Sequence, residues 1–300
     1  MSNLLWGVDL GGTKIECAVL SGDEVVARHR IPTEADQGYD HILSRIQQVL
    51  NETKDQVGEA PTRVGIGAPG TLDPQAGTMR GCNTTALNGR PLLNDLQARL
   101  NLEVQIANDA NCFALAEALL GAGKGHRVVF GVIMGTGVGG GIVVDGKVLS
   151  GLQGISGEWG HNPLEIGGEK CYCGRIGCVE TVLSGPAVER FYEGLTLTHK
   201  PLREIADLYR VAKDSEQDYD SEAFVVINNL INRFGQAIAQ IVNTLDPDAI
   251  VLGGGVGNIQ ELYTLGAEAA KRHIFNPNPQ IRLLPPKLGD SAGVFGAALL

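Results

Sequence analysis

The chain has 300 residues, of which 43% are hydrophobic, and a formal net charge of -10. That length can hold two domains with sizeable cores, and the acidic balance argues against a nucleic-acid partner. No stretch approaches ~18 consecutive apolar residues, and the first residues lack the pattern of a signal peptide. We therefore expect a cytoplasmic protein with no membrane partner.

Two stretches of the chain follow the same order of elements. Residues 6–32 read as a β-rich run, a glycine-rich turn, a second β-rich run, a Ser-Gly-Asp turn and a third short strand. Residues 129–151 repeat this order with an Asp-Gly turn. The repetition predicts an internal duplication, with a cleft between the two halves.

Helices and strands alternate along the rest of the chain. Apolar periodicity predicts helices over residues 39–55, 110–120, 184–192, 202–212, 221–245 and from about 258, and a last one opened by residues 289–293. Buried strands are expected over residues 63–66, 102–106 and 249–252. This alternation is typical of an α/β architecture.

Glycine-rich turns suggest an anion site. Gly135, Thr136 and Gly137 begin a G-x-G-x-x-G match, but a strand is expected after it, whereas the dinucleotide motif must open a helix. A glycine-rich hairpin tip instead exposes backbone N–H groups to an anion. A second such tip, Gly11-Gly12-Thr13-Lys14, and the run 253–255 complete a pattern that fits a polyphosphate; the alternative is that each run is only a tight turn.

Two aspartates follow predicted strands. Asp9 precedes the first glycine tip by two residues, where a carboxylate beside phosphates is a natural partner for the hydration shell of Mg²⁺. Asp109 lies outside the glycine loops and is available as a general base toward an acceptor hydroxyl. The spacing alone slightly favours the alternative, in which Asp109 is the N-cap of the following helix.

One histidine and three cysteines, His161, Cys171, Cys173 and Cys178, fall within eighteen residues. Three thiolates and one imidazole complete a tetrahedron around Zn²⁺ and leave no open position, which indicates a structural metal. The alternative is a cluster of buried or disulfide-bonded cysteines, although disulfides are rare in cytosolic proteins.

The segments together resemble the sugar kinases of the ROK family (repressors, open reading frames, kinases), within the actin, Hsp70 and hexokinase superfamily. The matching stretches are 8–14, Ala107-Asn108-Asp109-Ala110-Asn111, the 135–141 loop, Gly157-Glu158-Trp159-Gly160-His161, and C-x-C-G-x-x-G-C-x-E over 171–180. The resemblance implies a two-lobed actin-like (ribonuclease H-like) fold. We expect an N-terminal lobe over 1–115, joined by a helix over 288–300, and a larger lobe over 116–287.

The resemblance also implies transfer of the γ-phosphoryl of ATP to a sugar hydroxyl, usually O6, with Asp109 as general base. The implied sugar ligands are Asn83, Asn108, Asp109, Glu158, His161 and Glu180. The implied contacts to phosphates and Mg²⁺ are Asp9, Gly11, Gly12, Thr13, Lys14 and Gly135, Thr136, Gly137, with Gly254 and Gly255 on the adenosine side. His161 would bind zinc through one ring nitrogen and sugar through the other.

The sequence narrows the reaction further than it narrows the acceptor. The segment 157–164 looks most like fructokinase and mannokinase members, so fructose is expected first, with N-acetylglucosamine, N-acetylmannosamine or glucose as alternatives. Ala86 stands where such members carry a bulky aromatic residue, and it could make space for an N-acetyl group. Such kinases commonly form homodimers. A ROK repressor would need an N-terminal helix-turn-helix, for which the chain leaves no room, and a catalytically silent sugar-binding protein is a further alternative.

Overall fold

The computed structural model describes residues 4–214 and 221–300. The chain divides into two compact units. The first unit contains the described residues up to Arg127, with Gly141–Ser156 and Lys287–Leu300; the second contains Val128–Gly140 and Gly157–Pro286. Residues 116–127 and 141–156 thus belong with the N-terminal residues, whereas we expected them in the larger lobe. The lobe boundaries themselves stay a prediction.

The first unit is built on a five-stranded sheet with the order β3-β2-β1-β4-β7. Its strands are β1 (Leu4–Leu10), β2 (Lys14–Ser21), β3 (Glu24–Pro32), β4 (Arg63–Ala68) and β7 (Glu103–Asn108). The first three strands form the predicted antiparallel meander, and β4 and β7 add in parallel beside β1. A two-stranded hairpin, β5 (Thr71–Leu72) with β6 (Met79–Arg80), follows β4.

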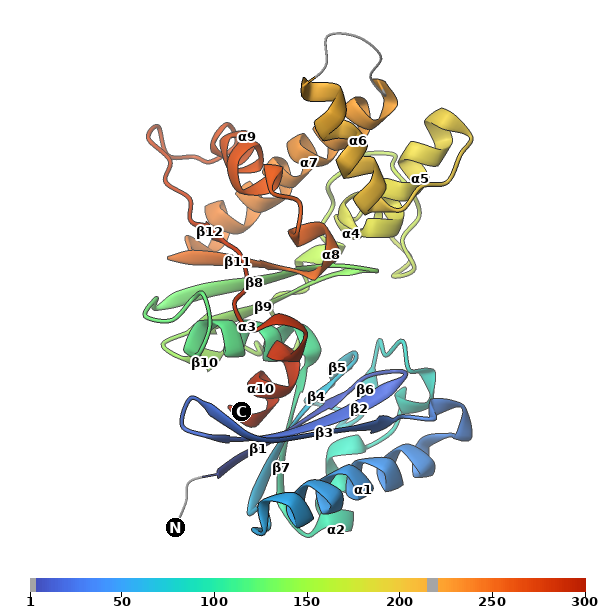
Figure 1. The fold of residues 1–300 in the computed structure, drawn as a ribbon, viewed down its shortest axis with the longest axis vertical. Coiled ribbons are helices and arrows are strands. Elements are labelled where there is room, and N and C mark those ends of the chain that lie inside the picture. Colours follow the sequence, from blue (N-terminus) through green and yellow to red (C-terminus); the bar gives the residue numbers. More distant parts are fainter. Residues whose placement is uncertain (1–3, 215–220) are drawn as a thin grey trace. The chain divides into compact units, whose positions relative to one another are not determined.

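Helices cover both faces of this sheet (Figure 1). On one face lie α1 (Tyr39–Val57) and α2 (Leu92–Leu100), and on the other lie α3 (Asp109–Leu119) and α10 (Ala292–Ala298). The α1 helix turns a stripe of apolar residues onto the sheet, as its periodicity predicts. The predicted helix over 110–120 is α3, so the residues around Asp109 join a strand to a helix.

The backbone of the last helix, α10, lies so close to two strands of the sheet that no side chain fits between them. A Cβ atom on Gly65 of β4 would lie 1.7 Å from the carbonyl oxygen of Ala297, and one on Gly7 of β1 would lie 2.3 Å from that of Val294. Any larger residue at these two positions would push α10 away from the strands. Glycine in these strands therefore reflects close approach of a neighbouring backbone.

The second sheet has the order β10-β9-β8-β11-β12. Its strands are β8 (Val128–Met134), β9 (Val138–Val144), β10 (Lys147–Val148), β11 (Ala249–Gly253) and β12 (Leu283–Leu284). The strands β8, β9 and β10 are the predicted repeat of the first meander, and the boundary between the units runs through β9. Strand β11 lies parallel to β8 and to β12.

Helices of the second unit pack around α7 (Ser221–Leu245), whose inner face is buried along its whole length. These helices are α4 (Glu180–Leu183), α5 (Gly185–Thr196), α6 (Leu202–Asp214) and α9 (Ala267–Lys271), whereas α8 (Gly254–Gly257) contacts β8 and β11. The helix expected from about residue 258 starts later: α8 ends at Gly257, and the next helical segment is a π-helical turn, Leu262–Gly266, that leads into α9. Three glycines within α8 explain its single turn, since glycine disfavours helix extension.

None of the helices within the described residues is long and apolar enough to cross a membrane.

Candidate active site

The second glycine turn, residues 135–137 (the second tip), joins β8 to β9 in the second unit. The N–H of Gly135 donates to the carbonyl of Gly137 at 2.9 Å, and the N–H of Gly185 donates to the carbonyl of Gly135 at 2.8 Å. The Glu180 carboxylate accepts the N–H of Val138 at 3.0 Å. Two segments remote in sequence therefore hold this tip in shape.

A side chain at Gly137 would displace the Glu180 carboxylate. A Cβ atom there would lie 2.7 Å from Glu180 Oε2, the same oxygen that accepts the N–H of Val138. At the end of the neighbouring strand, Gly254 has φ +80°, and a Cβ atom would lie 2.3 Å from the carbonyl oxygen of Met134. Gly254 therefore requires glycine both for its backbone conformation and for its contact with a neighbouring backbone, whereas Gly137 is crowded only by a side chain.

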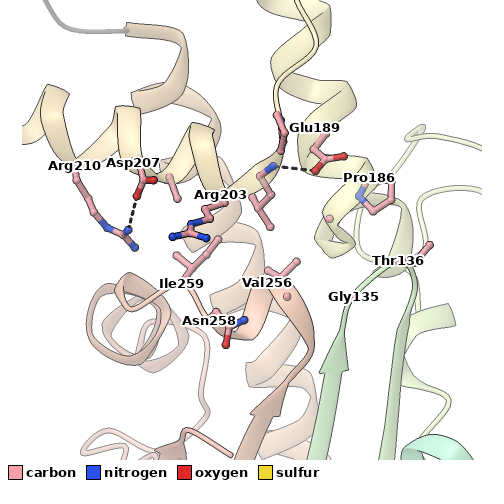
Figure 2. A pocket seen from close by; sticks show the side chains of 15 residues that line it. Gly135, Thr136, Pro186, Glu189, Arg203, Asp207, Arg210, Val256, Asn258 and Ile259 are labelled. Atoms are coloured by element: carbon pink, nitrogen blue, oxygen red, sulfur yellow. Dashed lines mark hydrogen bonds and ion pairs between the residues drawn. The ribbon is translucent and has the colours of Figure 1, made fainter. Parts of the chain in front are cut away.

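A cavity of about 820 Å³ opens beside the second tip, entirely within the second unit (Figure 2). Gly135, Thr136 and Gly255 line it, three residues that the sequence predicts to contact a nucleotide. Its remaining walls come from α5, from α6 and the residue before it, and from α8 and the turn after it: Gly185, Pro186, Glu189, Pro201, Leu202, Arg203, Ala206, Asp207, Arg210, Val256, Asn258 and Ile259. These walls were not predicted from the sequence, because no motif marks them.

Hydrogen bonds fix the walls of this cavity. Arg210 of α6 donates to Glu261 through two nitrogens, at 3.0 and 3.1 Å. The Glu189 carboxylate of α5 accepts the N–H of Leu202 at the start of α6, at 2.8 Å. Bidentate arginine–carboxylate pairs restrict geometry as well as adding energy, so α5, α6 and the turn after α8 keep a defined spacing.

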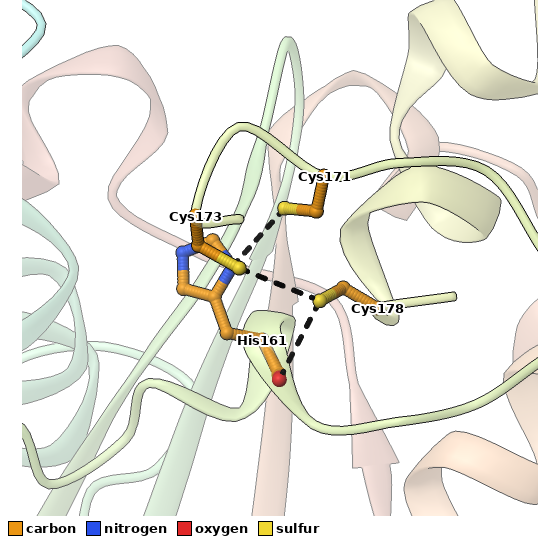
Figure 3. A group of neighbouring side chains, drawn as sticks. All are labelled: His161, Cys171, Cys173 and Cys178. Carbon is orange, nitrogen blue, oxygen red and sulfur yellow. Dashed lines mark hydrogen bonds between the residues drawn. The ribbon is translucent and has the colours of Figure 1, made fainter. Parts of the chain in front are cut away.

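The four predicted zinc ligands converge in the structure (Figure 3). Their ligand atoms all lie within 4.8 Å of one another. Cys171 Sγ is 3.6 Å from His161 Nδ1, and Cys173 Sγ is 3.7 Å from Cys178 Sγ. Usual Zn–S and Zn–N bond lengths in a tetrahedron give S···N and S···S edges of about 3.6 and 3.8 Å. The residues therefore fit a tetrahedral zinc ion, and no disulfide joins these cysteines.

The charges of the three thiols also favour a metal. Burial raises the pKa of Cys171 to about 12 and raises that of Cys178. Burial also opposes ionisation of Cys173, but hydrogen bonds from Arg175 and the other two thiols outweigh it and bring the pKa of Cys173 to about 6. Three neighbouring thiolates repel one another, and a divalent cation removes that repulsion.

The second ring nitrogen of His161 already has a partner. His161 Nε2 lies 3.0 Å from the hydroxyl of Tyr172, whose ring stands edge-on to the imidazole. Trp159 donates from its indole nitrogen to the carbonyl of Gly139 at 2.8 Å, which ties the 158–161 segment to β9. Glu158 is the first residue of this segment. His161 is predicted to contact both zinc and sugar. For the sugar contact, the Tyr172 hydroxyl must first move away from Nε2 of His161.

The first glycine turn, residues 11–14 (the first tip), is closed by a hydrogen bond from the N–H of Gly11 to the carbonyl of Lys14 at 3.0 Å. Thr33, which follows β3, braces it twice. Its N–H donates to the carbonyl of Thr13 at 3.0 Å, and its hydroxyl donates to the carbonyl of Gly11 at 2.7 Å. Gly12, Thr13 and Lys14 remain exposed, so the tip can meet an anion.

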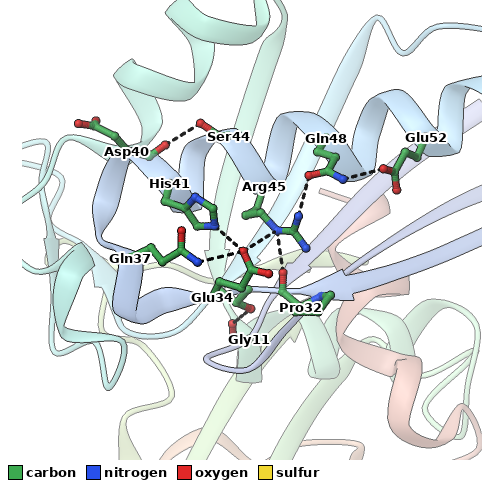
Figure 4. Close-up of polar contacts among 11 residues, drawn as sticks. Gly11, Pro32, Glu34, Gln37, Asp40, His41, Ser44, Arg45, Gln48 and Glu52 are labelled. Atoms are coloured by element: carbon green, nitrogen blue, oxygen red, sulfur yellow. Dashed lines mark hydrogen bonds and ion pairs between the residues drawn. The ribbon is translucent and has the colours of Figure 1, made fainter.

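The segment after β3 is held in turn by α1 (Figure 4). Glu34 has φ +53°, a left-handed conformation that is uncommon for a residue with a side chain. Its carboxylate accepts from His41 Nε2 at 2.7 Å, and Arg45 donates to the carbonyl of Pro32 at 2.9 Å. These bonds offset the backbone strain and keep Thr33 against the first tip.

Asp9 ends β1 beside this tip. Burial, together with the charges of Asp109 and Glu16, raises the pKa of Asp9 to about 6, against the opposing effect of Lys14 and Arg30. Gly67 and Gly293 flank its carboxylate, and a Cβ atom on either would reach it at 3.5 Å. A carboxylate that is crowded and near like charges is poised to attract a cation.

Glu16 lies opposite Asp9 in the β1–β2 pairing and is almost fully buried. Arg28 contacts its carboxylate at 2.6 Å, and Arg30 forms a second ion pair with it. Ser291, just before α10, donates to it at 3.4 Å. This network was not predicted from the sequence. The one signal was an acidic residue within a strand that is otherwise apolar.

Asp109 begins α3, but the N-cap role falls to its neighbour. Asn108 Oδ1 accepts the N–H of Ala110 at 2.9 Å, and Asn108 Nδ2 donates to the carbonyl of Gly70 at 3.0 Å. Asp109 Oδ1 also accepts that N–H, at 2.8 Å, while its side chain stays accessible to solvent. Crowding by the protein desolvates the carboxylate and raises the pKa of Asp109, against these hydrogen bonds.

Asn83 is exposed in the turn before a short 3₁₀ helix, Thr85–Leu87. Asn88 fixes this turn by accepting the N–H of Cys82 and donating to its carbonyl, at 2.9 and 3.0 Å. Ala86 is half-buried and packs against the core of the first unit. The Asn83 side chain is therefore free of the core and available to a ligand.

Comparison with known proteins identifies the family. The model of the ROK family matches residues 5–300. The chain belongs to the ROK family. It is 36% identical to an N-acetyl-D-glucosamine kinase of Haemophilus influenzae and 35% identical to one of Escherichia coli, over 99% of this chain and 99% of each relative.

Among solved structures, a ROK hexokinase of Thermus thermophilus superposes with a TM-score of 0.88 at 32% identity, over 99% of this chain and 97% of that one. A ROK glucokinase of Streptomyces griseus in complex with glucose and AMPPNP gives 0.76 at 29% identity, over 99% and 98%. The two-lobed ROK fold and a sugar kinase activity, both predicted from the sequence, are thereby confirmed. Fructose as the first choice of acceptor finds no support among these relatives.

Proposed function

We propose that this ROK kinase transfers the γ-phosphoryl group of ATP to O6 of N-acetyl-D-glucosamine. The observation that supports this acceptor is the similarity to N-acetyl-D-glucosamine kinases along the full length of both chains. This replaces fructose, which rested on the likeness of residues 157–164 to fructokinases. One short segment shared by several sugar kinases carries less information about the acceptor than similarity over the whole chain.

In the first unit, Asp109 is the proposed general base. Its raised pKa suits proton acceptance from the O6 hydroxyl better than an ordinary aspartate would, since a base works best near the operating pH. Asp9 would orient the hydration shell of Mg²⁺, which supplies charge neutralisation for the transferred phosphoryl group. The backbone N–H groups of residues 11–14 and the ammonium of Lys14 would donate hydrogen bonds to phosphate oxygens. Asn83 and Asn108 would hold sugar hydroxyls.

In the second unit, the 820 Å³ cavity is the proposed nucleoside site. Gly135, Thr136 and Gly137 would face the phosphates, and Gly254 and Gly255 would lie on the adenosine side. Glu158, His161 and Glu180 are the proposed sugar ligands. Glu180 would then act twice, because its Oε2 accepts the N–H of Val138 and its Oε1, which has only a long contact of 3.9 Å from Cys171 Sγ, would accept from a sugar hydroxyl.

Zinc is proposed as a structural ion held by His161, Cys171, Cys173 and Cys178. It would fix the loop that leads from His161 to Glu180, and so the positions of two proposed sugar ligands. The homodimer that the family resemblance implies stays a prediction, which molecular-mass measurement in solution can test.

A comparison of kcat/KM over five sugars tests the acceptor: N-acetylglucosamine, N-acetylmannosamine, glucose, mannose and fructose, each with Mg·ATP. We expect N-acetylglucosamine to lead fructose by at least about tenfold, because a site that hydrogen-bonds its substrate discriminates strongly. Preference for glucose or N-acetylmannosamine would reject the acceptor but keep the reaction. Failure to consume ATP with any of the five would reject the kinase proposal.

Ala86 offers a sharper test of the same acceptor. If the small side chain leaves room for the N-acetyl group, Ala86→Trp should lower kcat/KM for N-acetylglucosamine by about tenfold or more while sparing glucose, since a pocket that is too small excludes the larger ligand. Ala86→Val serves as the graded control. Equal losses for both sugars would mean that the substitution perturbs the fold and not the acceptor site.

A further inference from the structure

Two polar side chains that line the proposed nucleoside cavity stand apart from the hydrogen-bond network of the described residues. Among the described residues, neither the guanidinium of Arg203 nor the carboxamide of Asn258 has a hydrogen bond or ion-pair partner. Both side chains are exposed, and both line the cavity (Figure 2). The other arginine of the cavity, Arg210, is neutralised by Glu261 and Asp207. Arg203 is therefore the one cation in this cavity whose charge is unpaired among the residues described.

The surroundings of Arg203 fit a flat aromatic ligand. Apolar side chains of Pro186, Ala206, Val256 and Ile259 form walls on α5, α6, α8 and the turn after α8. The planar guanidinium stacks on aromatic faces and is weakly hydrated compared with an ammonium. Figure 2 shows Arg203 extending from α6 into the space near Ile259. A nucleotide base placed between the apolar walls and the guanidinium plane would be held by both of its faces. The edge of the base would remain free to form hydrogen bonds with another side chain.

Asn258 can recognise such an edge. It lies at the C-terminal end of α8, and the N–H of Asn258 donates to the carbonyl of Gly255, which fixes its backbone. A carboxamide offers one donor and one acceptor side by side, which complement the adjacent amino group and ring nitrogen of adenine. The corresponding edge of guanine presents two acceptors, so the same amide would leave one pair unmatched.

We propose that Arg203 stacks on the purine of the phosphoryl donor and that Asn258 selects adenine over guanine. This inference rests on the proposed kinase function and adds to it the residues that choose the donor. The two side chains have separate effects. Arg203 would contribute to affinity for any purine nucleotide, whereas Asn258 would contribute to the difference between adenine and guanine.

Isothermal titration of the full chain with ADP, GDP and inorganic tripolyphosphate separates these effects, because tripolyphosphate has no base. Wild-type protein should bind ADP at least about tenfold more tightly than GDP, the discrimination that one bidentate amide contact gives. Arg203→Ala should weaken ADP and GDP alike by about tenfold, the usual contribution of one stacked base, and leave tripolyphosphate unchanged. Asn258→Ala should bring the two affinities to within about threefold of each other.

Arg190→Ala is the matched control, because Arg190 is an exposed arginine of α5 outside this cavity, paired with Glu169. It should change none of the three affinities. Equal weakening of ADP and tripolyphosphate in Arg203→Ala would place Arg203 on phosphate and overturn the stacking contact. An unchanged ratio of ADP to GDP affinity in Asn258→Ala would overturn base selection. Wild-type protein that phosphorylates N-acetylglucosamine yet binds ADP and GDP equally would reject this inference while leaving the proposed function intact.

Discussion

The two glycine tips have the same place in a repeated meander but differ in the charged residues that the meander itself carries beside them. Charged side chains surround the first tip: Lys14 within it, Asp9 before it and Glu16 behind it. The second tip and its flanks, residues 134–141, contain no charged residue and present mainly backbone. One duplicated unit has thus given one tip with ionisable side chains around it and one that presents mainly backbone. The shared backbone shape suits anion binding in both tips, and the neighbouring side chains make the two tips chemically different.

The two tips also differ in what braces them. Thr33, which follows the third strand of the same meander, holds the first tip, with Glu34 and α1 behind it. Glu180 and Gly185, more than forty residues away, hold the second, and Glu180 lies just past the cysteine cluster. The first tip therefore depends on local structure, whereas the second depends on a loop that a metal would organise. Four experiments test this comparison.

The largest effect is expected beside the first tip. Asp109→Asn keeps the shape of the side chain and removes the base, so kcat should fall by roughly 10²-fold or more, the usual contribution of positioned proton transfer. Binding of ADP, measured by titration, should be unchanged. A variant with wild-type turnover would show that Asp109 only supports the start of α3.

Loss of a metal ligand should act on the second tip. Cys173→Ser should release zinc, lower the melting temperature and raise KM for sugar and ATP together, because structural zinc contributes directly to folding. Metal content and melting temperature are measured on the same purified protein. Active wild-type protein with clearly less than one zinc per chain would contradict the structural role, and Cys82→Ser, outside the cluster, is the control.

The contact between Gly137 and Glu180 can be tested by a double-mutant cycle. Gly137→Ala should raise KM for ATP by about tenfold, since the added methyl displaces a charged acceptor from the N–H of Val138. In a Glu180→Ala background the same substitution should have a much smaller effect, because the colliding carboxylate is gone. Additive effects would mean that the tip is braced in another way.

The smallest effect is a pH dependence at Asp9. As pH falls below about 6, Asp9 takes up a proton and loses the charge that attracts Mg²⁺, so the Mg²⁺ concentration for half-maximal rate should rise by about tenfold per pH unit. Without Mg²⁺ the sign for stability is opposite. The folded pKa lies above the unfolded one, so the ionised group destabilises the fold above pH 6, and this cost disappears toward pH 4. Asp9→Asn should show neither dependence.

Local patterns made much of this molecule predictable from its sequence. Both meanders, α1, α7 and the order of the other major elements follow from apolar periodicity and glycine turns, and all four members of the cysteine cluster lie within one short segment. The α2 helix was missed because its nine residues give little periodicity. The residues that depend on long-range pairing, such as Glu16 with Arg28 and the cavity walls on α5 and α6, could not be found without knowing which segments meet.

The route of residues 287–300 back into the first unit has a consequence for how the chain is made. Glu117, fully buried on α3, accepts the N–H groups of Ala122, Lys287 and Leu288, and α10 then packs onto the glycines of β1 and β4. A ribosome delivers residues 287–300 only after the whole second unit has been synthesised. Until then, one face of the first sheet has no covering helix α10 and Glu117 lacks two of its donors. The first unit to be translated is therefore the last to be completed. Its completion depends on the second unit's residues folding without obstructing the return of residues 287–300.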